Sequence, residues 1–419
     1  MTSNISDTSR KVTVIGAGIV GISCALHLQQ RGYDITIIDR LPPGEATSFG
    51  NAGVIATGAV VPVATPGIIK KVPSMLLDPL GPLSIRWSYL PRLMPWLRSF
   101  VRNSSPQKVE KISDALSQLL SASVEEHQLL TAGTGAEKWV RPAPYTYIYK
   151  DEQSFDKDAY VWKLRSDRGV KTQILRGGEV QEYEPALSSH YKLAVQLHDH
   201  GYILDPSQLI KTLAQHFQTA GGKLLRTKVR DFEIGPNGPE RLLTDTSPLE
   251  VDVLVIAAGA WSAELATKLG STIPLESERG YHITIDNSGV SLRGPIMSAA
   301  EKVVATPMTP GLRLAGLVEF GGLSAPPNYK RTRTLLKHAK RLFSGVNTAE
   351  FTEWMGHRPS LPDSLPVVAK SPVYPSVYYA FGHQHVGMTS GPKTGRLIAA
   401  LVAGESPNID LAPFKADRF

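Results

Sequence analysis

The sequence is poor in cysteine and has no long apolar run. Its 419 residues include one cysteine, Cys24, which excludes a disulfide within the chain and a cysteine-based metal cluster. No run of about 18 apolar residues occurs, which excludes a membrane-spanning helix. The first ten residues are polar and lack the apolar stretch of a signal peptide. These absences predict a protein of a reducing compartment, the cytoplasm, without a metal site.

Charge and composition narrow the class of protein further. Lys and Arg number 45 against 38 Asp and Glu, a net charge of +7 that is modest for this length. No stripe of basic and aromatic residues accompanies this charge, so we expect no nucleic-acid partner. With 42% hydrophobic and 20% charged residues, the composition is typical of an ordered globular protein. The length exceeds one ordinary core and predicts two domains.

The segment 11–40, KVTVIGAGIVGISCALHLQQRGYDITIIDR, has the pattern of a strand, a helix and a second strand. Gly16 suits the tight turn after the first strand, Gly18 a close approach to a pyrophosphate, and Gly21 close packing of helix and strand. Asp39 ends the second strand, where a carboxylate binds an adenosine ribose. The segment predicts a dinucleotide site but does not decide between NAD and FAD.

Two later segments complete this α/β domain. Leu249–Ile256 is an apolar strand that runs into Ala257-Ala258-Gly259-Ala260-Trp261. A strand at Val377–Phe381 precedes a turn with three glycines and a helix from about Lys393 to Val402. The amino terminus of that helix suits the part of a flavin that becomes anionic on reduction. The dinucleotide-binding domain is therefore discontinuous, and we expect it to comprise 10–60, 195–275 and 355–415.

The remaining residues, 61–194 and 276–354, are expected to form an α+β substrate or lid domain with a mixed sheet. Its predicted strands include 140–149 and 280–285, and its predicted helices include 109–130 and 330–342. In the first domain we expect a helix at 207–219 and a strand at 223–233.

The segment after Tyr89 sorts into an apolar face that contains Trp96 and Leu97 and a face with three arginines. Such a helix can lie in a membrane interface, which predicts a peripheral membrane contact through 87–101 on the inner face of the membrane. The alternative is a helix that packs its apolar face onto its own protein. Pro95 argues against one unbroken helix.

Together these segments resemble the D-amino-acid oxidase superfamily of flavoproteins. Within it they are most similar to the FAD-dependent D-amino-acid dehydrogenases, including D-hydroxyproline dehydrogenase-like members. Besides the first and central segments, the likeness includes SFGNAGVI, RGYHITI, LRLAGLVEFGG, GHRPSLPDSLPVV and FGHQHVGMTSGP. It spans nearly the whole chain and implies FAD, bound without a covalent link because no suitable cysteine exists.

The resemblance assigns two groups of site residues. FAD is expected to contact Gly16, Gly18, Ile19, Val20, Asp39, Arg40, Ser48, Asn51, Ala52, Gly53, Val54, Val229, Ala258, Gly259, Trp261, Gly382, Gly387, Met388 and Thr389. The substrate site is expected to include Arg358, Tyr281, His282, His383 and Glu319.

Each substrate residue has a competing structural role. Arg358 suits the substrate carboxylate, because a guanidinium makes two parallel bonds to it; the alternative is a structural ion pair. Tyr281 could steady the same carboxylate or pack in the core. His282 could shape the pocket, accept the amine proton or pack. His383 could face the substrate amine or be structural. Glu319 could bind an amino group or cap the glycine turn that follows it.

The resemblance implies oxidation of a D-amino acid, such as D-proline or cis-4-hydroxy-D-proline, to the imine by hydride transfer to flavin N5. Electrons would pass to a quinone or carrier protein. Three alternatives stay open: an oxygen-using oxidase of glycine or sarcosine, an NAD-dependent dehydrogenase, and a flavin-bearing subunit that relays electrons within a complex.

Overall fold

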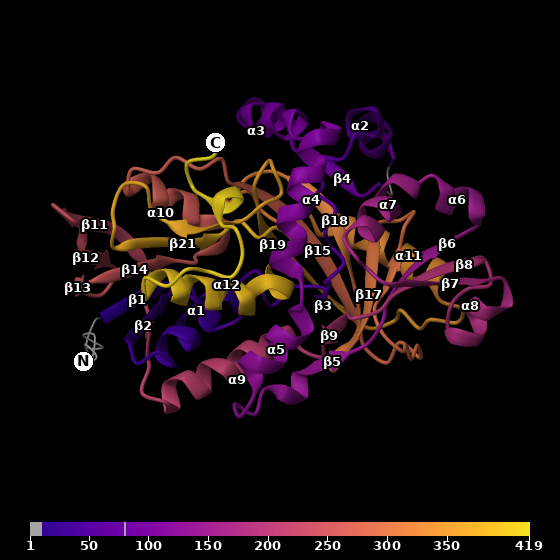
Figure 1. The fold of residues 1–419 in the computed structure, drawn as a ribbon. Coiled ribbons are helices and arrows are strands. Elements are labelled where there is room, and N and C mark those ends of the chain that lie inside the picture. Colours follow the sequence, from indigo (N-terminus) through magenta and orange to yellow (C-terminus); the bar gives the residue numbers. More distant parts are fainter. Residues whose placement is uncertain (1–10, 79–80) are drawn as a thin grey trace.

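The computed structural model describes residues 11–78 and 81–419 (Figure 1). The polar first ten residues, on which the expectation about a signal peptide rests, lie outside the described residues. Two large sheets organise the chain, and the figure shows them side by side, with helices packed over both.

The first sheet has six strands in the order β10-β2-β1-β14-β21-β20, all parallel except the last. Their bounds are β1 (Lys11–Ile15), β2 (Asp34–Asp39), β10 (Lys223–Arg226), β14 (Val253–Ile256), β20 (Val367–Lys370) and β21 (Val377–Phe381). The strands are apolar runs because both faces of the sheet are covered. Helices α1 (Ile19–Gln29), α9 (Pro206–Thr219) and α12 (Gly387–Val402) pack on one face. Helix α10 (Ser262–Lys268) and the small sheet β11 (Val229–Gly235), β12 (Gly238–Thr244) and β13 (Leu249–Glu250) cover the other.

The second sheet has nine strands and is mixed. Its order is β19-β15-β18-β17-β16-β6-β8-β7, and β4 pairs in parallel with β18. The bounds are β4 (Leu83–Ile85), β6 (Tyr145–Tyr149), β7 (Thr172–Arg176), β8 (Leu193–Leu197), β15 (Glu276–Ile285), β16 (Ile296–Ser298), β17 (Val303–Met308), β18 (Gly311–Phe320) and β19 (Phe351–Ser360). Helices α8 (Gly178–Tyr183) and α11 (Thr332–Leu342) pack on one face. Strands β8 and β19 cross the expected domain boundaries at 195 and 355.

The α/β class with a discontinuous dinucleotide-binding domain and an inserted mixed sheet is confirmed. A third sheet of β3 (Val54–Ile55), β9 (Gly201–Ile203) and β5 (Val140–Pro142) links the two parts. The remaining helices are α2 (Ile68–Leu77), α3 (Leu90–Arg102), α4 (Pro106–Leu120), α5 (Ser123–Thr131), α6 (Glu152–Asp156) and α7 (Ala159–Asp167). Within the described residues, none of the helices combines the length and apolarity needed to cross a bilayer.

Several predicted elements differ from those observed. The expected helix 109–130 is two helices, because Ala122 adopts a left-handed conformation with φ 56°. The expected strands 140–149 and 223–233 each divide between two sheets. The last helix begins at Gly387 and not near Lys393, so it includes Gly391 and Pro392.

Helix α3 runs unbroken through Pro95, contrary to the expected break. Its Leu93 and Trp96 are buried against Phe320 of β18, and the Trp96 indole donates to the carbonyl of Ser360 at 3.3 Å. The tryptophan expected to face a membrane therefore packs onto its own protein.

Candidate active site

The glycine turn after β1 has the geometry that its sequence predicts. Gly16 has φ +117°, and a Cβ there would lie 2.3 Å from the carbonyl oxygen of Ala257. A Cβ on Gly21 would lie 1.9 Å from the oxygen of Gly16, so helix and turn touch through backbone. At Gly18 the nearest atom to such a Cβ is the Ser48 hydroxyl, at 3.1 Å. The turn thus leaves bare backbone at the start of α1, where a helix amino terminus attracts phosphate.

This turn opens into a cleft of about 1190 Å³, a volume that includes its mouth to solvent. The cleft runs along the carboxyl ends of the parallel strands, where ligands bind in folds of this kind. All but four of the predicted cofactor residues line it. The four that do not are Ala52, Gly53, Val54 and Thr389. Thr389 instead ties the chain to α12, because its hydroxyl donates to Val54 at 3.2 Å and accepts from the Ala56 N–H at 3.0 Å.

Two polar side chains of the cleft, Asp39 and Arg40, are held in place by backbone N–H groups and by an aromatic ring. The Asp39 carboxylate accepts the Ala17 N–H at 2.7 Å and the Leu41 N–H at 3.0 Å. The Arg40 guanidinium lies 3.9 Å from the centroid of the Trp261 ring, a cation–π contact. The side chains of Arg40 and Trp261 both line the cleft, so together they form a flat and positively charged part of its wall.

Arg358 does not line the cleft itself but directly precedes Pro359, which does. Its guanidinium packs against Gly280, where a Cβ would lie 2.4 Å from Cζ and Nη2. Nη1 donates to the carbonyl of Leu317 at 3.0 Å and Nη2 to that of Gly316 at 3.3 Å. Leu317 has φ +60° at the point where the pairing of β15 and β18 slips, and such bulges re-aim groups beside active sites.

The Arg358 charge has a buried carboxylate near it. Glu278 pairs with Arg358 in the register of β15 and β19, and burial raises the pKa of the Glu278 carboxyl while the Arg358 charge opposes that shift. Among the described residues, the two hydrogen bonds use two of the five N–H groups of the guanidinium, which leaves three for an incoming anion.

Comparisons with known proteins bear directly on this arrangement. The family model described as FAD dependent oxidoreductase (DAO) matches residues 11–401. The chain belongs to this family. It is 39% identical to a D-amino-acid oxidase of Bradyrhizobium diazoefficiens, with 98% of this chain and 99% of the relative covered. It is 27% identical to a D-amino acid dehydrogenase of the same organism over 98% and 99% of the two chains.

Solved structures show the same fold at low sequence identity. L-proline dehydrogenase from P. horikoshii matches with a TM-score of 0.75 at 19% identity, over 98% of both chains. Glycine oxidase from Bacillus cereus matches with a TM-score of 0.71 at 19% identity, over 98% of this chain and 99% of that one. The family and its relatives identify the chain as an FAD-dependent amino-acid oxidoreductase.

The cleft fits FAD. Gly16 and Gly18 have no Cβ atoms, so a pyrophosphate can approach the backbone closely there. The space beside Gly259 is also open, because a Cβ on this residue would meet nothing within 4 Å. The only cysteine, Cys24, is buried in α1, so no cysteine is available for a covalent link.

His282 fastens the chain that follows the glycine turn to the second sheet. Its Nδ1 donates to the carbonyl of Gly50 at 3.1 Å, and its ring stacks on Trp354 with centroids 5.3 Å apart. Arg313 donates from Nη1 to the carbonyls of Phe49 and Asn51, both at 2.9 Å. Burial, with the Arg313 charge, lowers the pKa of His282 to about 3, so the ring is neutral. The structure thus gives His282 an anchoring position.

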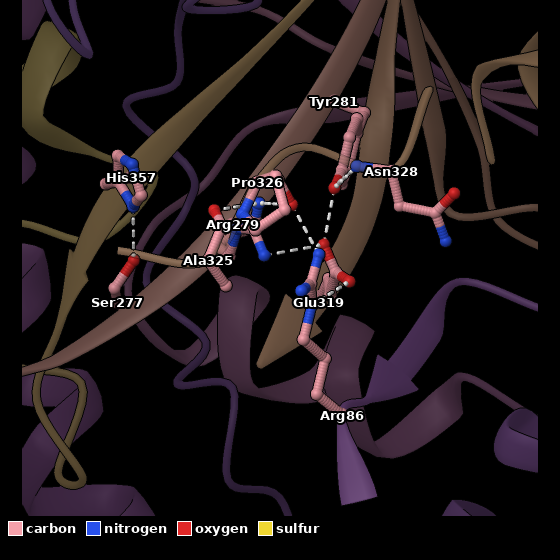
Figure 2. A network of polar contacts seen from close by, with 9 residues as sticks. All are labelled: Arg86, Ser277, Arg279, Tyr281, Glu319, Ala325, Pro326, Asn328 and His357. Carbon is pink, nitrogen blue, oxygen red and sulfur yellow. Dashed lines mark hydrogen bonds and ion pairs between the residues drawn. The ribbon is translucent and has the colours of Figure 1, made fainter. Parts of the chain in front are cut away.

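Tyr281 and Glu319 lie on the opposite face of the sheet from Arg358. Neighbouring residues of a strand point to opposite faces, and Gly280 faces the Arg358 guanidinium. Tyr281 accordingly points into the core beneath α11. Its hydroxyl donates to Glu319 and accepts the Asn328 N–H at 3.0 Å (Figure 2). The two residues therefore do not share a site with Arg358.

Glu319 is the centre of a buried ionic network (Figure 2). It pairs with Arg86 at 3.1 Å and with the fully buried Arg279 at 3.2 Å. Arg279 also donates to the carbonyls of Ala325 and Pro326 at 3.0 and 2.8 Å. Because Arg86 follows β4, the network fastens the segment that leads into α3 to the second sheet.

His383 lines the cleft but is already engaged. Its Nε2 lies 3.0 Å from the Thr394 hydroxyl of α12, and burial lowers its pKa to about 3. The sequence reasoning missed other cleft residues, among them Thr227, Lys228, Glu264 and Gln384. Thr227 and Lys228 directly follow β10. Their place at the carboxyl end of a parallel strand could have indicated that they line the cleft.

Proposed function

We propose that the chain oxidises a D-amino acid to the imine, with Arg358 binding the substrate carboxylate. The proposal rests on the way in which the surrounding backbone holds the Arg358 side chain. Its guanidinium donates to two backbone carbonyls and packs against Gly280, and with respect to the described residues these two bonds leave further N–H groups for a ligand. The D configuration is supported by the names of the relatives at 39% and 27% identity.

The cofactor would lie extended along the cleft. Gly16, Gly18 and the start of α1 would hold the pyrophosphate, and Asp39 the ribose. Arg40, Val229, Gly259 and Trp261 would surround the adenine half. Ser48 and the chain from Asn51 to Val54 would follow the ribityl group and ring, with Gly382 and α12 residues Gly387, Met388 and Thr389 at the pyrimidine end. The positive end of the α12 dipole there would stabilise negative charge.

FAD supplies the acceptor for a hydride from the substrate α-carbon. The chain's task is to orient and enclose the substrate. A bidentate bond from Arg358 would fix the carboxylate and so the direction of the α-carbon. Helix α3 covers the strand end after Arg358 through the contact of Trp96 with Ser360, which would keep water out. The released imine would hydrolyse to a 2-oxo acid, or stay cyclic if D-proline or cis-4-hydroxy-D-proline is the substrate.

Replacement of Arg358 by leucine tests the site. We expect the purified variant to bind FAD as the wild type does, and its kcat/KM for the best D-amino acid to fall at least about 100-fold, because a charge-assisted bidentate pair is lost. The exposed Arg98→Leu variant is the matched control. An Arg358→Leu enzyme with unchanged kcat/KM would contradict the role.

For the electron acceptor we propose a quinone or carrier protein. The segment around α2 and α3 supports a peripheral membrane contact, although not through Trp96. Its exposed apolar side chains are Ile69 at 53%, Leu77 at 82%, Trp87 at 72%, Met94 at 37% and Val101 at 38% exposure. Exposed cations, Lys70, Arg92, Arg98 and Arg102, accompany them. A basic and apolar surface of this kind suits an anionic membrane.

A vesicle assay tests the contact. We expect the wild type to pellet with vesicles of anionic phospholipid and the double variant Leu77→Ser, Trp87→Ser to remain in the supernatant. The matched control is Leu129→Ser, an exposed leucine of α5. Equal pelleting of all three proteins would contradict the membrane contact.

Oxygen is the alternative electron acceptor, favoured by the name of the relative at 39% identity. Release of one hydrogen peroxide per substrate oxidised would establish it.

A further inference from the structure

The turn that leads into α12 presents a second histidine, His385, on the side of Arg358. Gln384 adopts a left-handed conformation with φ +50°. Its N–H donates to the carbonyl of Pro359 at 3.0 Å, and its side-chain amide donates to that of Leu361 at 2.9 Å. Ser360 and His383 also form an antiparallel bridge. Residues 383–385 therefore run alongside the end of β19, which places His385 next to Arg358.

The surroundings of the two histidines differ. His383 is buried and engaged with Thr394. His385 is exposed, although Gln384 and Val386 on either side of it are buried. Among the described residues, no side chain or backbone group forms a hydrogen bond with its ring.

His385 is nevertheless crowded by protein. Burial by the surrounding atoms, and next the Arg358 charge, lower the pKa of His385 to about 4. Gln384, directly before His385, and Gly387, two residues after it, line the cofactor cleft, as does Pro359 beside Arg358. His385 and Arg358 lie next to these residues and do not line the cleft themselves. The ring is thus neutral, and it lies beside Arg358 next to residues that line the cleft.

We infer that His385 binds the amino group of the substrate while Arg358 binds its carboxylate. A neutral imidazole has one ring nitrogen that accepts a hydrogen bond, and Arg358 has only donors. An α-amino acid carries its acceptor group and its donor group on one carbon. Two anchors of opposite type therefore fix the remaining substituents of that carbon, including the hydrogen that faces the cofactor. This inference rests on the proposed oxidation of an amino acid.

The test compares two ligands that differ only in the amine. D-proline carries both groups, and cyclopentanecarboxylate has the same ring and carboxylate without the nitrogen; D-alanine and propanoate form a second pair. In FAD-loaded protein, the dissociation constant of the carboxylate follows from the change in the visible spectrum. The apparent dissociation constant of the amino acid follows from the rate of anaerobic bleaching at increasing concentration.

For His385→Ala we expect the amino-acid constant to rise about 10- to 100-fold, as the loss of a hydrogen bond to a charged group implies. The carboxylate constant should change less than about threefold. His385→Gln should recover part of the loss, because its amide oxygen also accepts. The control is His190→Asn, which alters an exposed histidine of another surface.

Either of two results would overturn the inference: equal weakening of both ligands, as a structural role gives, or no change in either. A wild type that binds the carboxylates but is bleached by no amino acid would instead count against the proposed function. The two failures are therefore distinguishable.

Discussion

A single methyl group at Gly280 tests the geometry on which the substrate site depends. In Gly280→Ala the new Cβ would lie 2.4 Å from Cζ and Nη2 of Arg358 and 2.8 Å from Nη1. Ordinary contacts begin near 3.4 Å, so the guanidinium must move by about 1 Å or more. The obstacle is the end of a flexible side chain and not backbone, so the fold can accept the change with a loss of about 1–3 kcal/mol.

The expected effect on catalysis is larger than that on stability. A displacement of about 1 Å in a positioning group costs about 100-fold in rate. We therefore expect kcat/KM for the best substrate to fall about 100-fold, with the FAD content of the purified protein unchanged. The assay is steady-state turnover with an artificial dye, alongside the absorbance ratio of flavin to protein.

The control for this variant is Gly178→Ala, at the start of α8, where a Cβ would meet nothing within 4 Å. Its kcat/KM should equal that of the wild type. If Gly280→Ala keeps kcat/KM within threefold of the wild type, Arg358 does not position the substrate and the reasoning is refuted.

Two further predictions concern stability. Glu319→Gln should lower the free energy of unfolding by about 3–5 kcal/mol, because Arg279 is fully buried and would lose its charged partner; urea unfolding measures this, and a loss below about 1 kcal/mol would show that the network is dispensable. Stability should also fall as the pH drops from about 6.5 towards 4. Burial lowers the pKa of His282 and His383 to about 3 and of His127 and His200 to about 4, so the unfolded chain takes up these protons first. Each such histidine contributes a slope of about 1.4 kcal/mol per pH unit, and a melting temperature that stays constant between pH 6.5 and 5 would contradict this.

The first nucleotide-binding unit could be predicted because its signals are local. Gly16 and Gly21 are required by backbone contacts within the unit, and the apolar strands on either side repeat with the period of a sheet. The start of α12 could not be found in this way. Gly391 and Pro392 are typical of a helix end, yet Gly391 and Gly395 lie within α12 because they face Ile19 and Ser23 of α1. A contact between the two ends of the chain decides that helix.

In the substrate site, too, some features could be predicted from the sequence and others could not. Arg358 was predicted from its motif, and in the structure two backbone carbonyls hold its guanidinium. The relation of Tyr281 to Arg358 depends on which face of β15 each residue occupies, and the alternation seen from Gly280 places them on opposite faces. His385 could not be told from His383 in the sequence, because both lie in the same turn and only the left-handed Gln384 stands between them.

This cleft binds FAD, and we propose that the protein uses it to oxidise a D-amino acid. The most direct measurement is the visible spectrum of the purified protein under anaerobic conditions, before and after each enantiomer of a panel of amino acids that includes proline and cis-4-hydroxyproline. We expect flavin bands that bleach with at least one D-amino acid and persist with its L-enantiomer. Bleaching by L-amino acids, glycine or sarcosine alone, with no response to any D-amino acid, would contradict it.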